Sequence, residues 1–328
     1  MFQYFKVVRI QNLLFLAFIQ VLLQETVLMP VLQIFGFQEA IEFNILLLLV
    51  TGSVLIAAGG YVLNDYFDIK IDRINHPDSQ IVGNIISRQT AMLMHQVLTG
   101  LGIICGLILA VILRSFTLGF IFIVIPGLLW FYSASYKRQF ITGNLVVSFI
   151  TAMSVLIVGV TQVAALQKEY GELVFETPIP NQIYSWIGGF AVFAFFCTWI
   201  REIIKDIEDE KGDREMECRT MAIKWGIQKT KLFLYGLITL TILLLFVADF
   251  FFIRFEGTLT LRYIVFGLVL PFSVLAYIIF KAKTPQEFHQ ASTLSKVIML
   301  IGVLYSLVFY YFQAKMFGIS LFNLFLVK

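Results

Sequence analysis

Residues 44–77 read NILLLLVTGSVLIAAGGYVLNDYFDIKIDRINHP, an apolar run that ends in a cluster of acidic side chains. Positions 44–64 contain no Asp, Glu, Lys or Arg. A helix needs about 20 apolar residues to cross the hydrocarbon core of a bilayer, which is about 30 Å thick. This stretch therefore predicts a membrane-spanning helix with carboxylates at one of its ends.

Similar apolar runs recur along the whole chain. Its 328 residues are 59% hydrophobic and 14% charged, with a mean hydropathy of +0.87. Soluble domains are about 45–50% apolar and about 25% charged, so this composition excludes an ordinary soluble enzyme and a disordered chain. The runs are continuous rather than alternating, which also excludes a transmembrane β-barrel. We place nine spans at residues 11–35, 44–64, 90–113, 116–136, 144–166, 183–204, 230–253, 262–281 and 293–313.

The sequence therefore predicts an all-α, multi-pass membrane helical bundle of about nine transmembrane helices, with residues 1–328 in a single domain. Arg9 precedes the first apolar run without a small-residue cleavage site after it, so we expect that run to stay as an anchor. A net charge of +3 is too small to indicate a nucleic-acid partner. The three cysteines, Cys105, Cys197 and Cys218, have neither a disulfide framework nor metal-ligand spacing.

The distribution of Lys and Arg predicts the orientation of the bundle. If nine spans alternate, the side that holds the N-terminus carries 18 of the 24 Lys and Arg residues, and the other side carries six. Cytoplasmic loops of membrane proteins are enriched in these residues. We therefore expect the N-terminus, and the acidic ends of the second and sixth spans, on the cytoplasmic side.

The sixth span ends in a second acidic stretch with the same spacing as the first. Residues 199–215 read WIREIIKDIEDEKGDRE. In both stretches three aspartates stand at positions i, i+3 and i+7, which fall on one face of a helix. The two triads are Asp65, Asp68 and Asp72, and Asp206, Asp209 and Asp213. Because both lie on the same predicted side of the membrane, we expect them to converge.

Converging carboxylates at a membrane boundary repel one another, and a hard divalent cation removes that repulsion. Oxygen ligands of this kind suit Mg²⁺, which also binds substrate phosphates. The two triads therefore predict a site for a diphosphate bridged by Mg²⁺. Nearby cations are candidates for the remaining phosphate oxygens, namely Lys70, Arg88, Lys137, Arg138, Arg201 and Lys205. The alternative is that pairs such as Asp68 with Arg73, or Glu202 with Lys205, merely solvate the helix ends.

These residues resemble the motifs of the UbiA superfamily of membrane prenyltransferases. The first family motif, N-D-x-x-D-x-x-x-D-x-x-N-x-P, stands complete as Asn64, Asp65, Asp68, Asp72, Asn75 and Pro77. The second resembles the branch that contains geranylgeranylglyceryl phosphate synthases, with Arg201, Glu202, Lys205, Asp206, Asp209, Gly212, Asp213, Arg219 and Thr220. Weaker similarities are Arg9, Asn12, Tyr132, Lys137, Arg138, Gly143, Asn144 and Lys296. The sequence departs from the family at Ser79 and Gln80, where a basic residue is common.

The resemblance implies Mg²⁺-dependent transfer of a prenyl group from an allylic isoprenyl diphosphate to a lipophilic, glycerophosphate-type acceptor. It implies that the main metal ligands and catalytic carboxylates are Asp65, Asp68, Asp206 and Asp209. Asp72 and Asp213 are expected to complete the metal sites. The expected substrate-binding residues are Asn12, Asn64, Lys70, Arg88, Tyr132, Lys137, Arg138, Arg201 and Lys205.

Three alternatives remain open from the sequence. An aromatic or quinone-precursor acceptor is compatible with the same metal chemistry. A cation transporter is expected to carry its acids near the middle of the membrane, whereas these acids lie at helix ends. The absence of the basic residue at Ser79 and Gln80 suggests a third possibility, a lipid-binding member that has lost catalysis.

Overall fold

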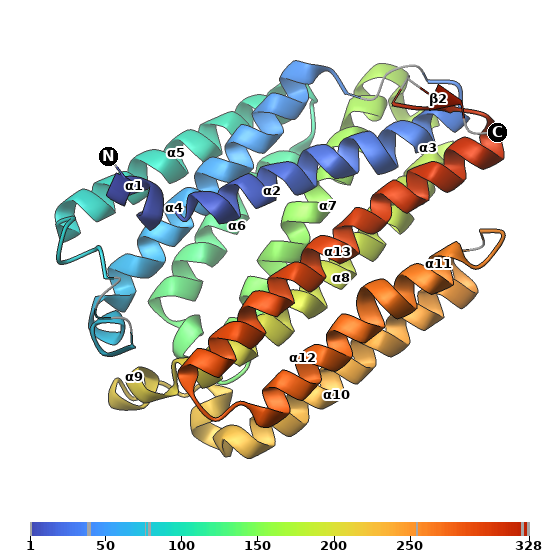
Figure 1. Cartoon of the computed structure of the whole chain (residues 1–328). Helices are drawn as coiled ribbons and strands as arrows, with labels where there is room; N and C mark the ends of the chain where they lie inside the picture. The colour runs from blue at the N-terminus through green and yellow to red at the C-terminus, as the bar shows by residue number, and fades with distance from the viewer. Residues whose placement is uncertain are drawn as a thin grey trace.

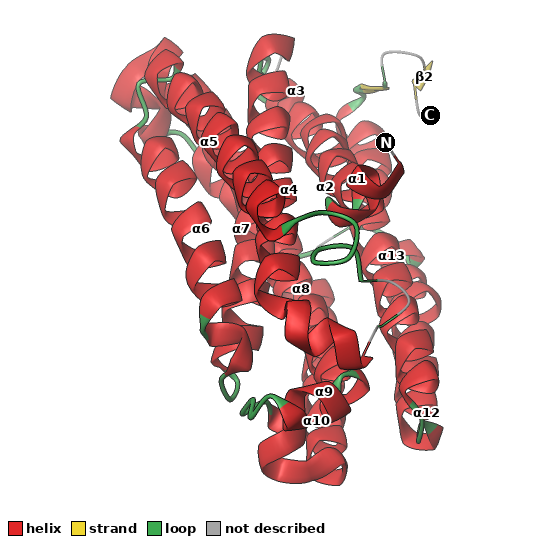
Figure 2. Ribbon diagram, turned by 90° about the vertical axis from the view of Figure 1, so that its left-hand side faces the viewer, coloured by secondary structure: helices red, strands yellow, loops and turns green. Residues whose placement is uncertain are grey.

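The computed structural model describes residues 2–37, 41–75, 77, 80–253, 255–322 and 325–326. Almost all of the described chain is helical (Figures 1 and 2). The elements are α1 (Phe2–Val7), α2 (Ile10–Leu23), η1 (Gln24–Leu28), α3 (Met29–Ile34), α4 (Phe43–Asn75), α5 (Arg88–Ile112), α6 (Phe116–Ala134), η2 (Tyr136–Arg138), α7 (Thr142–Tyr170), η3 (Gly171–Glu176), α8 (Ile179–Glu208), α9 (Glu210–Glu215), α10 (Met221–Phe251), α11 (Leu259–Arg262), η4 (Tyr263–Val269), α12 (Leu270–Lys281), α13 (Pro285–Phe317), β1 (Ser320–Leu321) and β2 (Phe325–Leu326).

The described residues contain nine helices that are long and apolar enough to cross a membrane. They correspond one to one with the nine predicted spans, which confirms an integral, multi-pass, all-α membrane protein. The first crossing helix is continuous through α2, η1 and α3 (Ile10–Ile34). Within the described residues, the sheet content is a single antiparallel pair of two-residue strands near the C-terminus, in which Ser320 pairs with Leu326.

Several helices extend well beyond their predicted apolar limits. Helix α4 continues from the predicted end at residue 64 to Asn75, and α8 continues from 204 to Glu208. At 1.5 Å per residue, the 33 residues of α4 span about 50 Å, more than the hydrocarbon core requires. The added turns carry charged residues at helical spacing, which does not interrupt a helix. The entire first acidic triad is therefore fixed on one rigid helix.

The described residues form three apolar clusters, and α8 and α13 contribute to the two larger ones. One core joins these helices to the N-terminal crossing helix, α4 and α7. The other joins them to α10 and α12, which form one edge of the bundle in Figure 1. Helices α4 and α5 approach closely where Gly102 faces Gly52. A Cβ atom on Gly102 would lie only 2.9 Å from the Gly52 carbonyl oxygen, so the absence of a side chain permits this approach. The bundle thus presents rigid helix ends on which a site can be built.

The acidic end of α4, the end of α8 and the short helix α9 lie at the same end of the bundle. Figure 2 shows α9 near one end, whereas α3 lies near the other. The η2 turn between α6 and α7 lies at the acidic end as well, because its Lys137 and Arg138 contact α4. The predicted convergence of the two acidic stretches at one end of the bundle is therefore confirmed.

Candidate active site

Carboxylates from both acidic triads line one pocket at this end of the bundle. Asp72 enters the pocket from α4, Asp206 from the last turn of α8, and Asp209 from the junction between α8 and α9. Asp213 on α9 completes the acidic side. The remaining lining includes the predicted residues Tyr132, Lys137, Arg138 and Lys205, together with Ile71, Asn75, Asn144, Glu202 and Cys218. Acidic and basic side chains from α4, η2, α8 and α9 thus line the same pocket.

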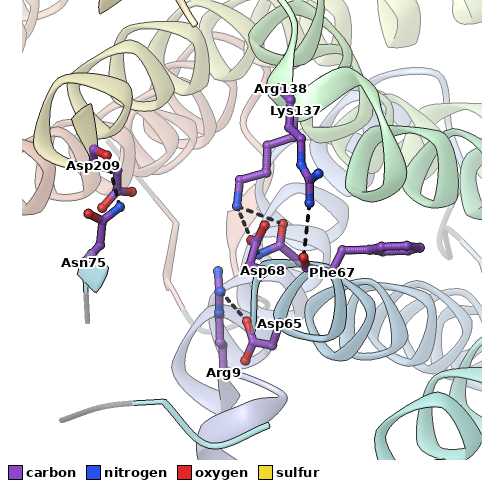
Figure 3. Close-up of polar contacts among 9 residues, drawn as sticks. Arg9, Asp65, Phe67, Asp68, Asn75, Lys137, Arg138 and Asp209 are labelled. Atoms are coloured by element: carbon purple, nitrogen blue, oxygen red, sulfur yellow. Dashed lines mark hydrogen bonds and ion pairs between the residues drawn. The ribbon is translucent and has the colours of Figure 1, made fainter. Parts of the chain in front are cut away.

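Lys137 compensates the charge of Asp68. Its ammonium group donates to the Asp68 carboxylate and, at 3.3 Å, to the side-chain oxygen of Asn64 (Figure 3). Asn64 itself donates to the same carboxylate at 2.8 Å. Burial alone would lower the pKa of Lys137, but Asp68, together with Tyr132 and Asp72, outweighs burial and raises the pKa. Lys137 therefore remains a cation at the edge of the pocket.

The position of Lys137 depends on Gly143 at the start of α7. A Cβ atom there would lie 2.6 Å from the Tyr136 carbonyl oxygen and 2.8 Å from the Lys137 Cα. Only glycine allows the η2 turn to lie this close to α7. The neighbouring Arg138 then donates to the Phe67 carbonyl oxygen at 3.2 Å, which fixes the turn on α4.

Arg9 compensates the charge of Asp65 on another side of α4. Its guanidinium donates to the Asp65 carboxylate at 2.9 Å and lies 5.0 Å from the centre of the Tyr61 ring. Burial alone would lower the pKa of Arg9, whereas Asp65 raises it, and the net pKa is raised. Arg9 separates α1 from α2 and has a φ of 54°, in the left-handed region that side chains other than glycine rarely adopt.

A second pocket lies beside this pair. It is lined by Lys6, Arg9, Asp65, Asp72, Gln80, Ile81 and Val82. Asp72 lines both pockets, so α4 forms a wall between them. Asp65 faces the second pocket, whereas the acids of the second triad face the first. The six aspartates are therefore arranged around α4 rather than in a single ring.

Asn75, at the end of α4, connects the two acidic stretches directly. Its side-chain amide donates to the Asp209 carbonyl oxygen at 3.0 Å (Figure 3). The same side chain accepts from the Gly212 backbone N–H at 2.8 Å. A Cβ atom on Gly212 would lie 2.6 Å from the Asn75 amide, so only glycine fits at this contact. The asparagine of the first motif thus holds the glycine of the second.

The acids of the second triad lie in a partly buried environment. Asp206 accepts a hydrogen bond from the Asn144 side chain at 2.9 Å. Burial raises the pKa of Asp213 to about 7, so this carboxyl is close to half-protonated at neutral pH. Burial also raises the pKa of Cys218 to about 11, which keeps its thiol protonated. Cys218 therefore lines the pocket as an uncharged side chain.

The donors in the first pocket fit Mg²⁺ by chemistry, because most of them are carboxylate and amide oxygens. Within the described part of the chain, no three His, Cys, Asp or Glu side chains are grouped closely enough to hold a metal ion by themselves. Mg²⁺ typically takes only one or two protein carboxylates and completes its coordination with water and substrate phosphate. A divalent ion is thus expected here together with a phosphorylated ligand.

Several predicted site residues lie outside both pockets. Lys70 and Arg88 are exposed, and Asn12 lines neither pocket. Arg201 also lies outside the pocket lining, but its guanidinium donates to Glu202, which lines the first pocket, at 2.6 Å. Asp68 pairs with Lys137 instead of the helix-end partner Arg73 that the alternative reading suggested. The direct role of Asn12, Lys70 and Arg88 in substrate binding stays a prediction.

The departure from the family pattern falls partly on described residues. Ser79 lies outside the described residues. Gln80 is buried, and its amide donates to the Ile69 carbonyl oxygen at 2.8 Å. This bond attaches the segment after α4 to α4 itself.

The sequence contained only a weak signal for Asn144 and Arg9, namely their similarity to the family. Their partners Asp206 and Asp65 are 62 and 56 positions away along the chain, so no local pattern connects them.

Comparison with known proteins identifies the relatives of this fold. The model of the UbiA prenyltransferase family matches residues 27–295. A digeranylgeranylglyceryl phosphate synthase from Saccharolobus solfataricus is 32% identical over 254 residues, which cover 76% of this chain and 79% of that protein. The family match spans both acidic stretches.

Two solved structures share the fold. One comes from work on a digeranylgeranylglyceryl phosphate synthase in membranes, with a TM-score of 0.62, 22% identity, and coverage of 94% of this chain and 97% of that chain. The other is a UbiA homologue from Archaeoglobus fulgidus bound to GPP and Mg²⁺, with a TM-score of 0.54, 15% identity, and coverage of 93% and 99%. At these identities the two structures support the helical architecture alone.

We predict that Asn75→Ala loosens α9. The variant removes two hydrogen bonds between α4 and α9, which together contribute about 1–3 kcal/mol. Amide hydrogen exchange across Glu210–Glu215 should therefore accelerate by about tenfold or more, and turnover should fall because Asp209 and Asp213 lose their fixed positions.

Asn84→Ala is the matched control. Asn84 is exposed, and its side chain makes only long contacts, of 3.4 and 3.5 Å, with Gln80. Its removal should leave exchange in α9 unchanged. Equal exchange in wild type and Asn75→Ala would show that the connection between the acidic stretches is not maintained by Asn75.

Proposed function

The chain belongs to the UbiA prenyltransferase family, and we propose that it catalyses Mg²⁺-dependent transfer of a prenyl group from an allylic isoprenyl diphosphate to a prenylglyceryl phosphate in the membrane. The observation that carries this proposal is the single pocket lined by Asp72, Asp206, Asp209 and Asp213 together with Lys137, Arg138 and Lys205. Two relatives support both substrates: one is a digeranylgeranylglyceryl phosphate synthase, and the other is a UbiA homologue bound to GPP and Mg²⁺.

In this proposal the diphosphate of the donor occupies the first pocket. Asp68, Asp206 and Asp209 would be main ligands of Mg²⁺, with Asp72 and Asp213 completing the sites. Asp65, the fourth expected main ligand, lines the neighbouring second pocket and would act from there. Lys137 and Arg138 line the same pocket and would bind the phosphate oxygens. When bound, Mg²⁺ neutralises the charge that develops on the departing diphosphate.

The reaction breaks the bond between the allylic carbon and the diphosphate oxygen, and the electron pair leaves with the diphosphate. A hydroxyl oxygen of the acceptor forms the new bond to the same carbon and loses its proton. The allylic carbon carries positive charge between these events, so water must be excluded. The buried ring of Tyr132 lines the pocket and presents an aromatic face to such a charge. Lys205 lines the pocket, and Asn64 is bonded to Asp68 and Lys137 beside it.

We also propose that residues 1–328 form one functional domain. Two observations support this. Helices α8 and α13 take part in the core on each side of the bundle, so the two halves share these helices. The family match extends from the first crossing helix to α13. A pocket formed by α4, η2, α8 and α9 requires the helices of both halves.

The proposed activity is tested by a matrix of donors and acceptors with the purified protein. We expect labelled allylic diphosphates to be transferred to a prenylglyceryl phosphate when Mg²⁺ is present, and not when it is chelated. Product formed only with an aromatic acid or naphthoate would replace the glycerolipid acceptor with the quinone-precursor alternative. Absence of product with every acceptor would support a member that has lost catalysis.

A second prediction concerns the acids of the pocket. Asp209→Asn should lower turnover by about 10²-fold or more, because it removes a ligand of the ion that stabilises the departing diphosphate. Glu208→Gln, one position earlier, is the matched control, since Glu208 accepts from His289 at 2.9 Å and does not line the pocket. Similar turnover in the two variants would contradict the metal assignment.

We further propose that the N-terminus and both acidic stretches face the cytoplasm. The excess of Lys and Arg on that side supports this orientation. We expect a membrane-impermeant maleimide to label Glu172→Cys in intact cells and Glu215→Cys only in inverted vesicles, in a background that lacks the native cysteines. Both positions are exposed, one in η3 and the other in α9. The reverse labelling pattern would overturn the orientation.

A further inference from the structure

One carboxylate in the first pocket lies outside both aspartate triads. Glu202 lines this pocket from α8, four residues before Asp206. Side chains four residues apart lie on the same face of a helix, and a rise of about 1.5 Å per residue places Glu202 about 6 Å farther into the bundle. The acidic face of α8 therefore extends one turn inward from the second triad, to a residue that the i, i+3, i+7 pattern does not include.

The Glu202 carboxylate is held in place by its neighbour Arg201. The Arg201 guanidinium donates to the Glu202 Oε1 atom at 2.6 Å, and only 19% of the Arg201 side chain and 13% of the Glu202 side chain are exposed. An ionised carboxylate has two oxygens with several acceptor positions, so this bond leaves room for a second donor. Glu202 is thus a fixed and shielded carboxylate that can still accept a hydrogen bond or a proton.

The depth of Glu202 corresponds to the place where the new bond forms in the proposed reaction. The diphosphate of the donor is expected at the aspartates, and its prenyl chain runs from this polar end toward the apolar interior of the bundle. The allylic carbon is the first carbon of that chain, so it lies inward of the diphosphate. Glu202 is farther inward along α8 than Asp206 and Asp209 and lines the same pocket. The acceptor hydroxyl therefore meets the allylic carbon at the level of Glu202.

The reaction also requires a base for the proton of that hydroxyl. Bond formation leaves the acceptor oxygen as a protonated ether, which is a strong acid and must lose its proton. The aspartates of the pocket are assigned to Mg²⁺, and lysine and arginine side chains carry no acceptor atom. Among the described residues that line the pocket, Glu202 is the one carboxylate that remains. Its bond to Arg201 does not prevent this role, because a protonated ether transfers its proton even to a weak base.

We infer that Glu202 is the catalytic base that removes the proton of the acceptor hydroxyl, an inference that rests on the proposed function. The bond between the allylic carbon and the diphosphate breaks, and its electron pair leaves with the diphosphate. The acceptor oxygen donates a lone pair to the allylic carbon and keeps the electron pair of its O–H bond. The proton passes to a carboxylate oxygen of Glu202, and exchange with solvent then restores the ionised carboxylate.

The test separates ionisation of the donor from capture by the acceptor. A donor with ¹⁸O in the bridging position scrambles its label when the carbon–oxygen bond breaks and reforms, which is measured with a deoxy acceptor that lacks the reacting hydroxyl. We expect Glu202→Gln to lower transfer to the prenylglyceryl phosphate by about 10²-fold or more and to change scrambling by less than about threefold. Asp209→Asn should lose both activities, and Glu208→Gln, which lies outside the pocket, should keep both.

A thiol in place of the acceptor hydroxyl supplies a second readout. A thiol ionises far more readily than an alcohol, so its attack depends less on a base in the protein. The ratio of wild-type to Glu202→Gln kcat/KM should therefore be at least about tenfold smaller with the thiol acceptor than with the alcohol. Equal ratios with the two acceptors would overturn the assignment. Loss of scrambling in parallel with transfer would also overturn it, because Glu202 would then act on the donor or on the fold.

The wild-type protein separates failure of this inference from failure of the proposed function. Wild type that transfers prenyl groups only to an aromatic acceptor rejects the proposed function, and the inference with it. Wild type that uses the prenylglyceryl phosphate, together with a Glu202→Gln variant that transfers at a similar rate, rejects the inference alone.

Discussion

Compensation of buried carboxylates by cations from distant segments is the constraint on which this end of the molecule depends. Asp68 and Asp65 lie on one long helix, and each is neutralised by a residue that is 69 or 56 positions away. Removing one partner of such a pair leaves a charge of high energy in a region of low dielectric constant. The η2 turn and the break between α1 and α2 are therefore held against α4 by electrostatics as much as by packing.

The same compensation explains how a substrate site is preserved before substrate arrives. The bundle limits repulsion among the six carboxylates by distributing them over two pockets on either side of α4 and pairing some with cations. In the proposed function, a diphosphate with its metal ion would replace some of these partners. Lys137 would then serve as a counter-ion of the ligand instead of Asp68. Asn75 keeps the two acidic stretches in register during that exchange.

The sequence predicted the helices and the meeting of the acids better than it predicted the partners of those acids. Apolar length identifies a crossing helix, and the i, i+3, i+7 spacing assigns three acids to one face, because both are local properties. Lys70 shows the limit of proximity along the chain: two positions from Asp68, it lies on the other side of the helix and is exposed. Lys137, Arg9 and Asn144 reach the acids only through helix packing, which no local pattern specifies.

The pairing of Lys137 with Asp68 also depends on a steric requirement at Gly143. The contact that excludes a side chain there is with backbone atoms of Tyr136 and Lys137, so no rotamer change can relieve it. A single added methyl group on α7 would thus act at a distance, as a loss of charge neutralisation at Asp68 on α4. The pairing of Lys137 with Asp68 therefore depends on the absence of a side chain at Gly143, a residue that itself carries no charge.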